Sequence, residues 1–573
     1  MQDPVPTDPA PRELTLPDQS QMVASLRAAM QAAQPGMEVS LIETHISFVL
    51  LTPQFTFKFK KALDLGFLDY STLARRRGCC AEELRLNRRS APDLYLDVVS
   101  VRGTPAAPTL EGQGPVIDVA VRMRTFAQED LWDHLAQRGA LGPAHIDALV
   151  ATLARLHAEA AVAPADGRLG SPAQVREPML DNLRVLGDLL QTATERCRLE
   201  RLRAWEPPAF DALAAVFRWR QQDGWIRECH GDLHLGNVTQ VDGRTTVFDC
   251  IEFNDDFRWI DTISDIGFLA MDLHVHGLTA LANRFVNACL EASGDYAGMR
   301  VLRYYVVHRA LVRAKVKALR DAQQPPAQGS DRVARHLAMA ESFCRASVAP
   351  VLMITHGLSG SGKTTLTQDL LERVGAVRIR SDVERKRLFG LPANARTAAE
   401  GSGMLYGAAA GEATYARLFE LAAPVLAGGF CAVLDATFLQ RQQRDAARRF
   451  AAEQGVRLII LDFDVDPATL RERVRQRRAR GADASDADLP VLEAQLRSAE
   501  PLAADEAAEV LSCVPMVATG DGRPCLDSST LHALAVRLGR EMLPTPEPPP
   551  APVRHASSAV GAPGIPRSRQ GNS

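Results

Sequence analysis

Apolar residues recur in short runs along the first part of the chain and at helical spacing along the next. Between about residues 20 and 125 the runs are short and bounded by polar residues, which is typical of β-strands. They cover residues 46–51, 55–60, 96–101 and 116–123, with one helical pattern at 71–89. From about 128 to 345 the pattern is mostly helical, apart from a loop and strand around 229–252. The chain is therefore predicted to begin with a β-rich segment and to continue as helices.

Strand and helix patterns alternate in the last part of the chain. The apolar runs there cover residues 351–355, 376–379, 431–434 and 458–463. Such alternation is the signature of a parallel α/β sheet. The change of pattern predicts a boundary near residues 348–350.

The two ends of the chain differ in composition from the rest. Residues 1–18 are rich in Pro and Asp, and residues 542–573 mix Pro, Ser and Gly. Segments of this composition bury too little apolar surface to fold, so we predict disordered tails. Between them we expect two domains, at 19–347 and 348–541, because 573 residues exceed a single hydrophobic core.

Composition and charge exclude several classes of protein. A hydrophobic content of 46% and a charged content of 24% are those of a globular protein, and no apolar stretch approaches the ~20 residues of a membrane span. The net charge of −3 gives no global attraction to nucleic acid or to anionic membranes. The ten cysteines are scattered, as expected for reduced thiols, and the N-terminus does not resemble a signal peptide. We therefore expect a cytoplasmic protein without membrane contact.

Residues 357–364 form a complete phosphate-binding loop of the pattern G-x-x-x-x-G-K-[ST]. The loop follows an apolar strand and precedes a helical pattern, which is the context that a nucleotide site requires. Its backbone N–H groups and the helix N-terminus favour phosphate, Lys363 would reach the β- and γ-phosphates, and Thr364 would hold Mg²⁺. The predicted ATP-binding residues are Gly357, Ser359, Gly360, Ser361, Gly362, Lys363, Thr364 and Thr365.

Three further features of this region favour a small phosphotransferase over other P-loop proteins. Asp382 follows the second predicted strand, where it could position an acceptor hydroxyl, although it could also cap the next helix. Asp435 ends the third predicted strand, a position suited to Mg²⁺. Residues 471–480 contain six arginines, and such a stretch can close over ATP. Arg475 and Arg478, at i and i+3, are the candidates for this role, while a solvated helix face or a nucleic-acid patch remains the alternative.

A second group of polar residues lies in the first half of the chain, in the sequence Cys-His-Gly-Asp-Leu-His-Leu-Gly-Asn at 229–237. Its spacing, with Asp249 twelve residues after Asn237 at a strand end, resembles that of phosphotransferases with a protein-kinase-like core. There Asp232 would orient the acceptor hydroxyl, Asn237 and Asp249 would hold Mg²⁺, and His230 would support the loop. Two alternatives are a metal pair formed by His230 and His234, and an ordinary turn before a hairpin.

The same residues resemble the aminoglycoside phosphotransferase and choline-kinase-like superfamily, over about residues 35–345. The resemblance implies a small-lobe sheet with a lysine for the α- and β-phosphates. Lys58 and Lys60 share one strand face, and we prefer Lys60, with Glu82 or Glu83 as its partner. A solvated strand face is the alternative for this lysine pair.

Two departures from that family set the N-terminal half apart. No Gly-rich loop stands before Phe55, where Thr-His-Ile-Ser-Phe occupies residues 44–48, and Asp249 is followed by Cys-Ile-Glu instead of Phe-Gly. Both leave room for a first half that binds a ligand without turnover.

The second half, about residues 349–541, resembles P-loop kinases related to polynucleotide kinase, gluconate kinase and zeta-toxin-type enzymes. The combination resembles the bacterial bifunctional aminoglycoside phosphotransferase/ATP-binding protein family. We therefore expect two tandem ATP- and Mg²⁺-dependent phosphotransferase domains that act on hydroxyl groups of a small molecule. Two alternatives are a protein in which only the P-loop half is active and a nucleic-acid 5′-hydroxyl kinase, although nucleic acid is not the expected partner.

Overall fold

The structure is a computed structural model of the chain. It describes residues 13–34, 36–66, 68–110, 112–323, 332–345, 349–393, 395, 407–480, 487–513, 515–517 and 524–539. Residues 1–12 and the predicted tail at 542–573 lie outside the described residues. Helix α1 (Leu16–Ala33) begins inside the segment 1–18, which we had predicted to be disordered. A capping box explains its start, since the Thr15 hydroxyl accepts from the Asp18 N–H and the Asp18 carboxylate accepts from the Thr15 N–H.

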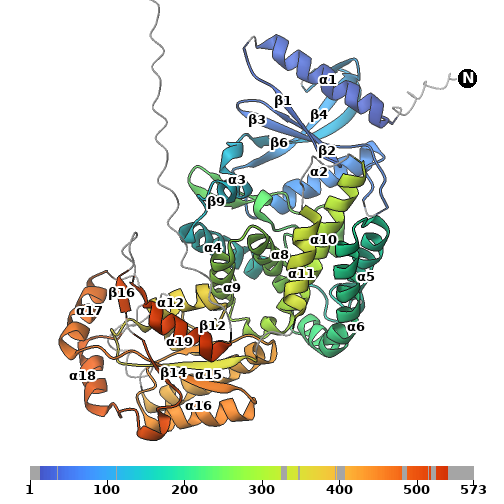
Figure 1. The fold of residues 1–573 in the computed structure, drawn as a ribbon. Coiled ribbons are helices and arrows are strands. Elements are labelled where there is room, and N and C mark those ends of the chain that lie inside the picture. Colours follow the sequence, from blue (N-terminus) through green and yellow to red (C-terminus); the bar gives the residue numbers. More distant parts are fainter. Residues whose placement is uncertain are drawn as a thin grey trace, which may run out of the picture.

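The N-terminal part folds around an antiparallel sheet of six strands, drawn in blue at the top of Figure 1. The strands are β1 (Ser40–Glu43), β2 (Ser47–Leu51), β3 (Phe55–Lys60), β4 (Tyr95–Thr104), β5 (Ala107–Thr109) and β6 (Val116–Arg124), in the order β1-β2-β3-β6-β4-β5. The strands and the helix predicted for this part are confirmed within a few residues, and the helix is α2 (Leu73–Asn87).

The two faces of this sheet are covered by different helices. Side chains alternate along a strand, so Phe57 and Phe59 of β3 point to one face and pack in the cluster that contains α1. Lys58 and Lys60 therefore point to the other face, where α2 lies. This alternation brings two lysines to the helix that carries Glu83.

Helices make up most of the chain between residues 132 and 344. They are α3 (Trp132–Gln137), α4 (Pro143–Glu159), α5 (Pro172–Leu189), α6 (Ala193–Gln222), α8 (Thr262–Val275), α9 (Thr279–Ser293), α10 (Met299–Gln323) and α11 (Arg332–Cys344). Short elements interrupt them, namely β7 (Ile226–Glu228), η2 (Leu235–Asn237), β8 (Val238–Val241), β9 (Arg244–Val247), α7 (Asp255–Arg258), β10 (Trp259–Asp261) and η3 (Tyr296–Gly298). Helix α8 is the central helix of this part, since twelve of its fourteen residues are buried.

The C-terminal part contains a parallel five-stranded sheet of order β12-β13-β11-β14-β15, as the alternating pattern predicted. The strands are β11 (Val351–His356), β12 (Val377–Arg380), β13 (Ala432–Asp435), β14 (Arg457–Asp462) and β15 (Val510–Ser512). The helices around it are α12 (Lys363–Val374), α13 (Ser381–Leu388), α15 (Ala408–Ala427), α16 (Arg441–Glu453), α17 (Pro467–Arg480), α18 (Leu489–Ser498) and α19 (Ser528–Leu538). A hairpin, β16 (Pro515–Val517) with β17 (Pro524–Leu526), precedes α19.

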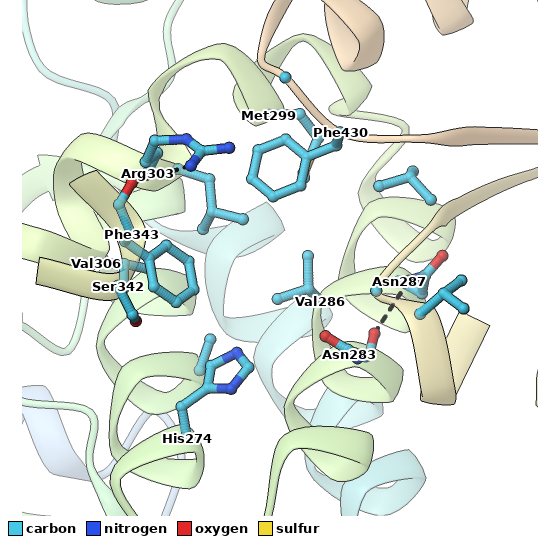
Figure 2. Close-up of a pocket in the computed structure, with 16 residues that line it drawn as sticks. His274, Asn283, Val286, Asn287, Met299, Arg303, Val306, Ser342, Phe343 and Phe430 are labelled. Carbon is cyan, nitrogen blue, oxygen red and sulfur yellow. Dashed lines mark hydrogen bonds between the residues drawn. The ribbon is translucent and has the colours of Figure 1, made fainter. Parts of the chain in front are cut away.

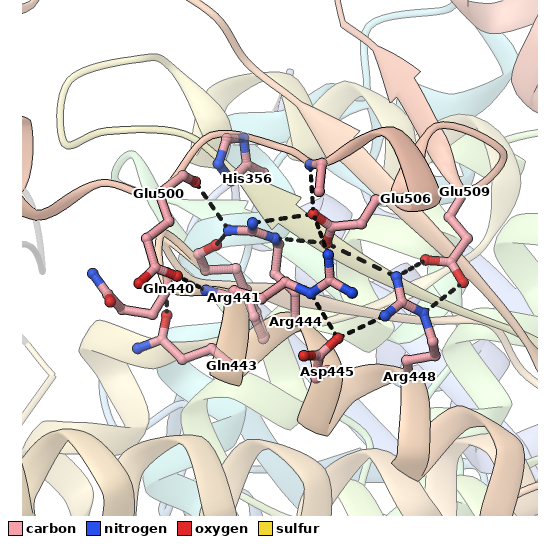
Figure 3. A network of polar contacts seen from close by, with 12 residues as sticks. His356, Gln440, Arg441, Gln443, Arg444, Asp445, Arg448, Glu500, Glu506 and Glu509 are labelled. Carbon is pink, nitrogen blue, oxygen red and sulfur yellow. Dashed lines mark hydrogen bonds and ion pairs between the residues drawn. The ribbon is translucent and has the colours of Figure 1, made fainter.

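Arginines of helix α16 bind the segment that leads from α17 and α18, together called the lid, to β15. Figure 3 shows Arg441, Arg444 and Arg448 pointing toward the acidic residues of that segment. Arg444 is fully buried, and its guanidinium donates to both oxygens of Glu506 at 2.8 and 3.1 Å. Bidentate pairs of this kind fix geometry as well as charge. The network therefore holds the chain behind α17 and α18 in one place.

The two parts of the chain pack against each other through helix α9. Asn287 of α9 donates to Ala376 O at 3.0 Å and accepts from Arg378 N at 2.8 Å. These backbone groups lie on the free edge of β12, so the Asn287 amide takes the place of a neighbouring strand. Asn283 adds a bond to Glu372 O of α12 at 2.9 Å. One apolar cluster also includes buried residues from both parts, such as Leu290, Met299, Val377 and Leu418.

We expect Asn287→Ala to lower the free energy of unfolding by about 2–4 kcal/mol, because two buried backbone groups would lose their partner. Asn283→Ala is the matched control and should cost less than about 1 kcal/mol, because it removes one partly buried bond. Urea or thermal unfolding of the whole chain would measure both. Equal effects of the two substitutions would contradict this role of Asn287.

Candidate functional site

The loop 229–237 lies between β7 and β8, and the side chain of His230 supports it from within. His230 Nε2 donates to Phe248 O at 2.8 Å, and its Nδ1 accepts from Asp232 N at 3.3 Å. The same residue links the loop to the strand end that carries Asp249, because Ile251 N donates to His230 O at 3.1 Å. His230 therefore connects the loop to the segment that carries Asp249 through both its side chain and its backbone.

Helices α8 and α10 hold the backbone of this loop. The Asp265 carboxylate accepts from the N–H groups of His230 and Gly231 at 2.8 and 2.9 Å. Arg309 donates to Gly231 O at 3.1 Å. Gly231 has φ +86°, and a Cβ there would lie 2.5 Å from Phe257 O. A larger residue at this position would therefore clash as well as strain the backbone.

Asp232 and Asn237 form the polar end of the loop. Asn237 Nδ2 donates to Asp232 O at 2.9 Å and to Asp232 Oδ2 at 3.2 Å. Burial raises the pKa of Asp232, but the charge and hydrogen bond of His234, with the charges of Arg313 and His230, lower it below its ordinary value. Because the Asp232 side chain is still 34% exposed, an ionised carboxylate is available to a ligand.

The two lysines of β3 have different partners. Lys58 Nζ lies 2.8 Å from Glu83 Oε1 and also pairs with Asp249. Lys60 is buried and pairs with Glu83 and with Glu252. Burial opposes the charge of both amines, but their carboxylate partners raise both pKa values well above the ordinary value. Both lysines are thus held as cations over one carboxylate of α2.

These contacts change our preference between the two lysines. Lys58 is the one that pairs with Asp249, the predicted metal ligand, while Lys60 faces the core and Tyr70 OH also donates to its partner Glu252. Glu83 is the partner from α2, because Glu82 pairs instead with Arg85 and Arg258. The preference for Lys60 rested on sequence spacing, which does not distinguish two residues on the same strand face.

The turn between β1 and β2 lies where the kinase-like family would have a Gly-rich loop. The Thr44 hydroxyl accepts from Ser47 N at 2.9 Å and closes the turn. Burial lowers the pKa of His45 at its tip, as do the charges of Arg320 and Lys61, while Asp232 and Asp249 act in the opposite sense. The turn therefore extends to the charges of the loop 229–237 and of α10.

The phosphate loop lies between β11 and α12 with its lysine folded into it. Lys363 Nζ donates to Gly357 O at 2.9 Å and to Leu358 O at 2.8 Å. Burial lowers the pKa of Lys363 to about 8, an effect that the carboxylates of Asp435 and Asp382 partly offset. The predicted site residues Asp435 and Asp382 therefore both act on the amine of Lys363.

The predicted residues around the phosphate loop differ in exposure. Asp435 ends β13, and its buried Oδ2 has no hydrogen-bond partner in the described part of the chain. Asp382 lies in the first turn of α13 and accepts from Arg385 at 3.2 Å. Thr364 is partly buried at the helix N-terminus, whereas Thr365 is exposed. Other residues of the loop are buried, namely Gly357, Ser359 and Ser361, while Gly360 and Gly362 are half-buried.

Two arginines of α17 outside the predicted pair, Arg473 and Arg477, act on the phosphate loop. Arg473 Nη1 lies 3.4 Å from both Gly360 O and Ser361 O, and the charge of Arg477 acts on Lys363. Arg475 points outward, is 59% exposed and contacts Glu472. The side chain of Arg478 lies outside the described residues. The i, i+4 pair Arg473 and Arg477 was missed because the run of arginines offers no sequence signal for which face is turned inward.

Other residues near this site were not predicted from the sequence. Gln495 of α18 accepts from Ser359 N at 2.9 Å, which ties the lid to the phosphate loop. Arg378 of β12 donates to Thr364 O at 2.8 Å. Tyr415 OH lies 3.3 Å from Thr437 Oγ1 and accepts from Phe438 N at 3.2 Å. No local pattern identifies these residues, since each comes from a distant element.

The structure does not bring His230 and His234 together as a metal pair. Both ring nitrogens of His230 are hydrogen-bonded, to Phe248 O and Asp232 N, and His234 Nδ1 accepts from Gly236 N at 3.0 Å. Among the described residues, one group could offer three ligand atoms, His157, Cys229 and Asp265. Asp265 in that group is already bound to the loop amides, so its contacts are those of a structural network.

A cavity of about 250 Å³ lies where α9 and α10 meet the C-terminal part. Figure 2 shows Phe343, Phe430, Val286 and Val306 around it, with His274 and Arg303 at its border. Arg303 donates to Phe343 O at 2.9 Å and lies over the Phe430 ring. None of the predicted site residues lines this cavity.

Comparison with protein families agrees with this architecture. Residues 80–305 match the family described as the phosphotransferase enzyme family, and residues 352–502 match the family described as an AAA domain. The chain therefore has a kinase-like phosphotransferase domain followed by a P-loop domain, as the sequence predicted. These matches support a phosphotransferase of some kind.

Relatives and solved structures cover one or both domains. An uncharacterized protein of Mycobacterium tuberculosis is 28% identical over 450 residues, which is 78% of this chain and 88% of that protein. A choline/ethanolamine kinase family protein from Mesorhizobium loti is 15% identical, with a TM-score of 0.34, over 57% of this chain and 100% of its own. A gluconokinase from Sinorhizobium meliloti is 19% identical, with a TM-score of 0.22, over 33% of this chain and 97% of its own. Within the described residues, no helix is both long and apolar enough to cross a membrane.

We expect Lys58→Met to impair ATP binding and Lys60→Met to impair stability. Lys58→Met should weaken ATP binding to the N-terminal site and leave the fold intact. Lys60→Met should instead lower the free energy of unfolding by about 3 kcal/mol or more, because it leaves a buried carboxylate without its partner. Titration calorimetry in a Lys363→Ala background and thermal unfolding would separate the two. Loss of ATP binding in a fully stable Lys60→Met variant would restore our original preference.

The lowered pKa of Lys363 predicts proton uptake when ATP binds. At about pH 9 the free amine, with its pKa of about 8, is mostly neutral, and a bound phosphate favours the charged form. The uptake should therefore approach one proton per P-loop and vanish in Lys363→Arg. Lys58 is already charged, so the N-terminal site contributes none. Calorimetry in two buffers of different ionisation enthalpy measures it, and equal uptake in Lys363→Arg would contradict the assignment.

Proposed function

We propose that this chain is a tandem ATP-dependent phosphotransferase that transfers the γ-phosphoryl group to hydroxyl groups of a small molecule. The observation that carries the proposal is the convergence of Lys58, Glu83 and Asp249 beside the loop of Asp232 and Asn237. These residues come from β3, α2 and two separate loop segments, and kinase-like phosphoryl transfer uses the same set of groups.

The donor sets of both halves fit Mg²⁺. Asn237 and Asp249 would hold it in the first half, and Thr364 and Asp435 in the second. These are oxygen donors, which Mg²⁺ prefers, and the buried Asp435 Oδ2 lacks a hydrogen-bond partner in the described part of the chain. A bound Mg²⁺ neutralises and orients the phosphates of ATP.

In the N-terminal half, Asp232 accepts the hydrogen bond of the acceptor hydroxyl and holds it in line with the γ-phosphorus. Lys58 leaves Asp249 for the α- and β-phosphates and keeps its bond to Glu83. Asp265, His230 and Arg309 position the loop without touching the reacting atoms. Rate acceleration then comes from positioning and charge instead of covalent chemistry.

In the C-terminal half, Lys363 leaves the loop carbonyls for the β- and γ-phosphates. Asp382 positions the acceptor hydroxyl, and Arg473 and Arg477 of α17 neutralise charge on the transferring group. Gln495 keeps α18 on the phosphate loop, so closure of the lid and binding of ATP act on the same segment.

One alternative has an observation in its favour. The turn at Thr44–Ser47 stands in place of a Gly-rich loop, and the N–H groups of Ile46 and Ser47 already donate to the Thr44 hydroxyl. The N-terminal half would then bind a ligand without turnover, and only the P-loop half would be an active kinase. Unchanged activity in Asp232→Ala would favour this alternative.

We expect Lys363→Ala to abolish activity of the C-terminal half and Asp232→Ala to abolish that of the N-terminal half, by 100-fold or more, on the order of the loss for a reacting-group contact. The assay is ATP consumption by wild type and both variants against sugars, aminoglycosides, nucleosides and 5′-hydroxyl oligonucleotides. Thermal unfolding controls for folding. If Asp232→Ala matches wild type on every acceptor while ATP still binds, the tandem proposal fails. If oligonucleotides are the preferred acceptor, the small-molecule assignment fails.

A further inference from the structure

Helix α10 carries cationic side chains along the side that faces the loop of Asp232. Arg309 bonds to Gly231 O at 3.1 Å, and Arg313 follows one helical turn later. Arg320 lies two further turns along the helix. Residues at i, i+4 and i+11 lie on the same face of a helix, so these three arginines form a row that begins at the loop.

Arg313 is not directly paired with a carboxylate in the described part of the chain. It forms no hydrogen bond or ion pair there, and its Nε is buried without a partner. Ion pairs satisfy a buried guanidinium group elsewhere in the described residues. Arg220, for example, makes four hydrogen bonds to Asp261 and Asp295. A buried donor without a partner costs free energy, and such a site favours a ligand that supplies an acceptor.

The charge of Arg313 acts on the predicted acceptor side of the site. It is among the charges that lower the pKa values of Asp232 and of Asp272 on α8. Both carboxylates already have hydrogen-bond donors, Asn237 for Asp232 and Leu235 N for Asp272. Arg320 adds a second positive charge that acts on His45 in the turn between β1 and β2. The guanidinium of Arg313 therefore lies close to the reacting group without a hydrogen bond to either carboxylate.

We propose that the acceptor of the N-terminal half is a hydroxyl compound that also carries a phosphate or carboxylate group, bound by Arg313 with Arg320. This inference rests on the phosphotransferase function proposed for that half. The planar guanidinium pairs with either anion through two parallel hydrogen bonds. It also offsets the repulsion between an anionic acceptor and the phosphates of ATP.

The reaction is balanced with ATP as the only co-substrate. The bond between the γ-phosphorus and the bridging oxygen to the β-phosphate breaks, and a bond from the acceptor oxygen to the γ-phosphorus forms. The hydroxyl proton passes to the Asp232 carboxylate and then to solvent. The products are ADP and a phosphate ester that retains the original anionic group.

The test compares four acceptors of one carbon skeleton, glucose, gluconate, glucose 6-phosphate and glucosamine, in a Lys363→Ala background. Phosphate transfer is measured in that background and in Arg313→Gln, Arg313→Lys and Arg320→Gln. Lys315→Gln is the matched control, since Lys315 carries the same charge on the same helix but pairs with Asp181 of α5 at 3.1 Å. Thermal unfolding and ATP binding report whether each variant folds.

We expect kcat/KM to be highest for one of the two anionic acceptors, and the two compounds distinguish carboxylate from phosphate. Arg313→Gln should raise KM for that acceptor about tenfold or more and leave KM for ATP within about twofold. Arg313→Lys should lose less, because it keeps the charge without the fork. Lys315→Gln should leave both values unchanged.

Three outcomes would overturn the inference. Preference for glucose or glucosamine, with transfer still dependent on Asp232, removes the anionic acceptor but leaves the phosphotransferase function standing. An effect of Arg313→Gln on KM for ATP alone assigns this residue to the nucleotide. Absence of any transfer dependent on Asp232, across these four compounds and the wider screen, removes the function itself and the inference with it.

Discussion

The buried carboxylate of Asp265 is the contact on which the first candidate site depends. It accepts two consecutive backbone N–H groups, of His230 and Gly231, and its Oδ2 also lies 3.3 Å from His157 Nε2. Burial raises the pKa of this carboxyl, but these donors and the charge of the two histidines lower it to about 2. A buried anion of this kind is stable only while its donors stay in place. Because Asp265 lies on the central helix α8, the position of Asp232 is set by the core of the helical part.

The two candidate sites are assembled in different ways. The P-loop site is local: one strand, one loop and one helix N-terminus supply its backbone donors within consecutive residues. The kinase-like site is assembled from side chains that are far apart in sequence: Lys58 lies on β3, and Asp249 follows 191 residues later. A local site survives small shifts of the rest of the chain, whereas an assembled site requires the sheet and the helical part to stay in register.

Helix α9 joins these two kinds of site in one body. It packs on α8, which carries Asp265, and its Asn287 completes the edge of β12 in the P-loop sheet. Arg378 of the same strand then reaches Thr364 O at the start of α12. An edge strand is prone to pair with other chains, and here a side-chain amide covers part of it. The junction thus satisfies buried backbone groups and fixes the relative position of the two parts.

How much of this could be predicted from the sequence differs between the fold and the sites. Most strands of both sheets were predictable, because apolar runs and their alternation with helices are local signals, whereas the short edge strands β1, β5 and β15 were not predicted. The phosphate loop was predictable for the same reason, since its residues and their chemistry are consecutive. The start of α1 at Leu16 was also a local signal, the capping box at Thr15 and Asp18, but its Pro- and Asp-rich surroundings concealed it.

The choice among equivalent residues required the tertiary structure. Lys58 and Lys60 share a strand face, and only the position of the strand end that carries Asp249 separates them. The arginines of α17 are equivalent in sequence, and only the packing of that helix turns Arg473 toward the phosphate loop. Sequence alone thus determined which elements form and which chemistry they carry, because propensity and motif spacing are local. Tertiary structure decided which side chains meet, because contacts across long separations depend on how whole elements pack.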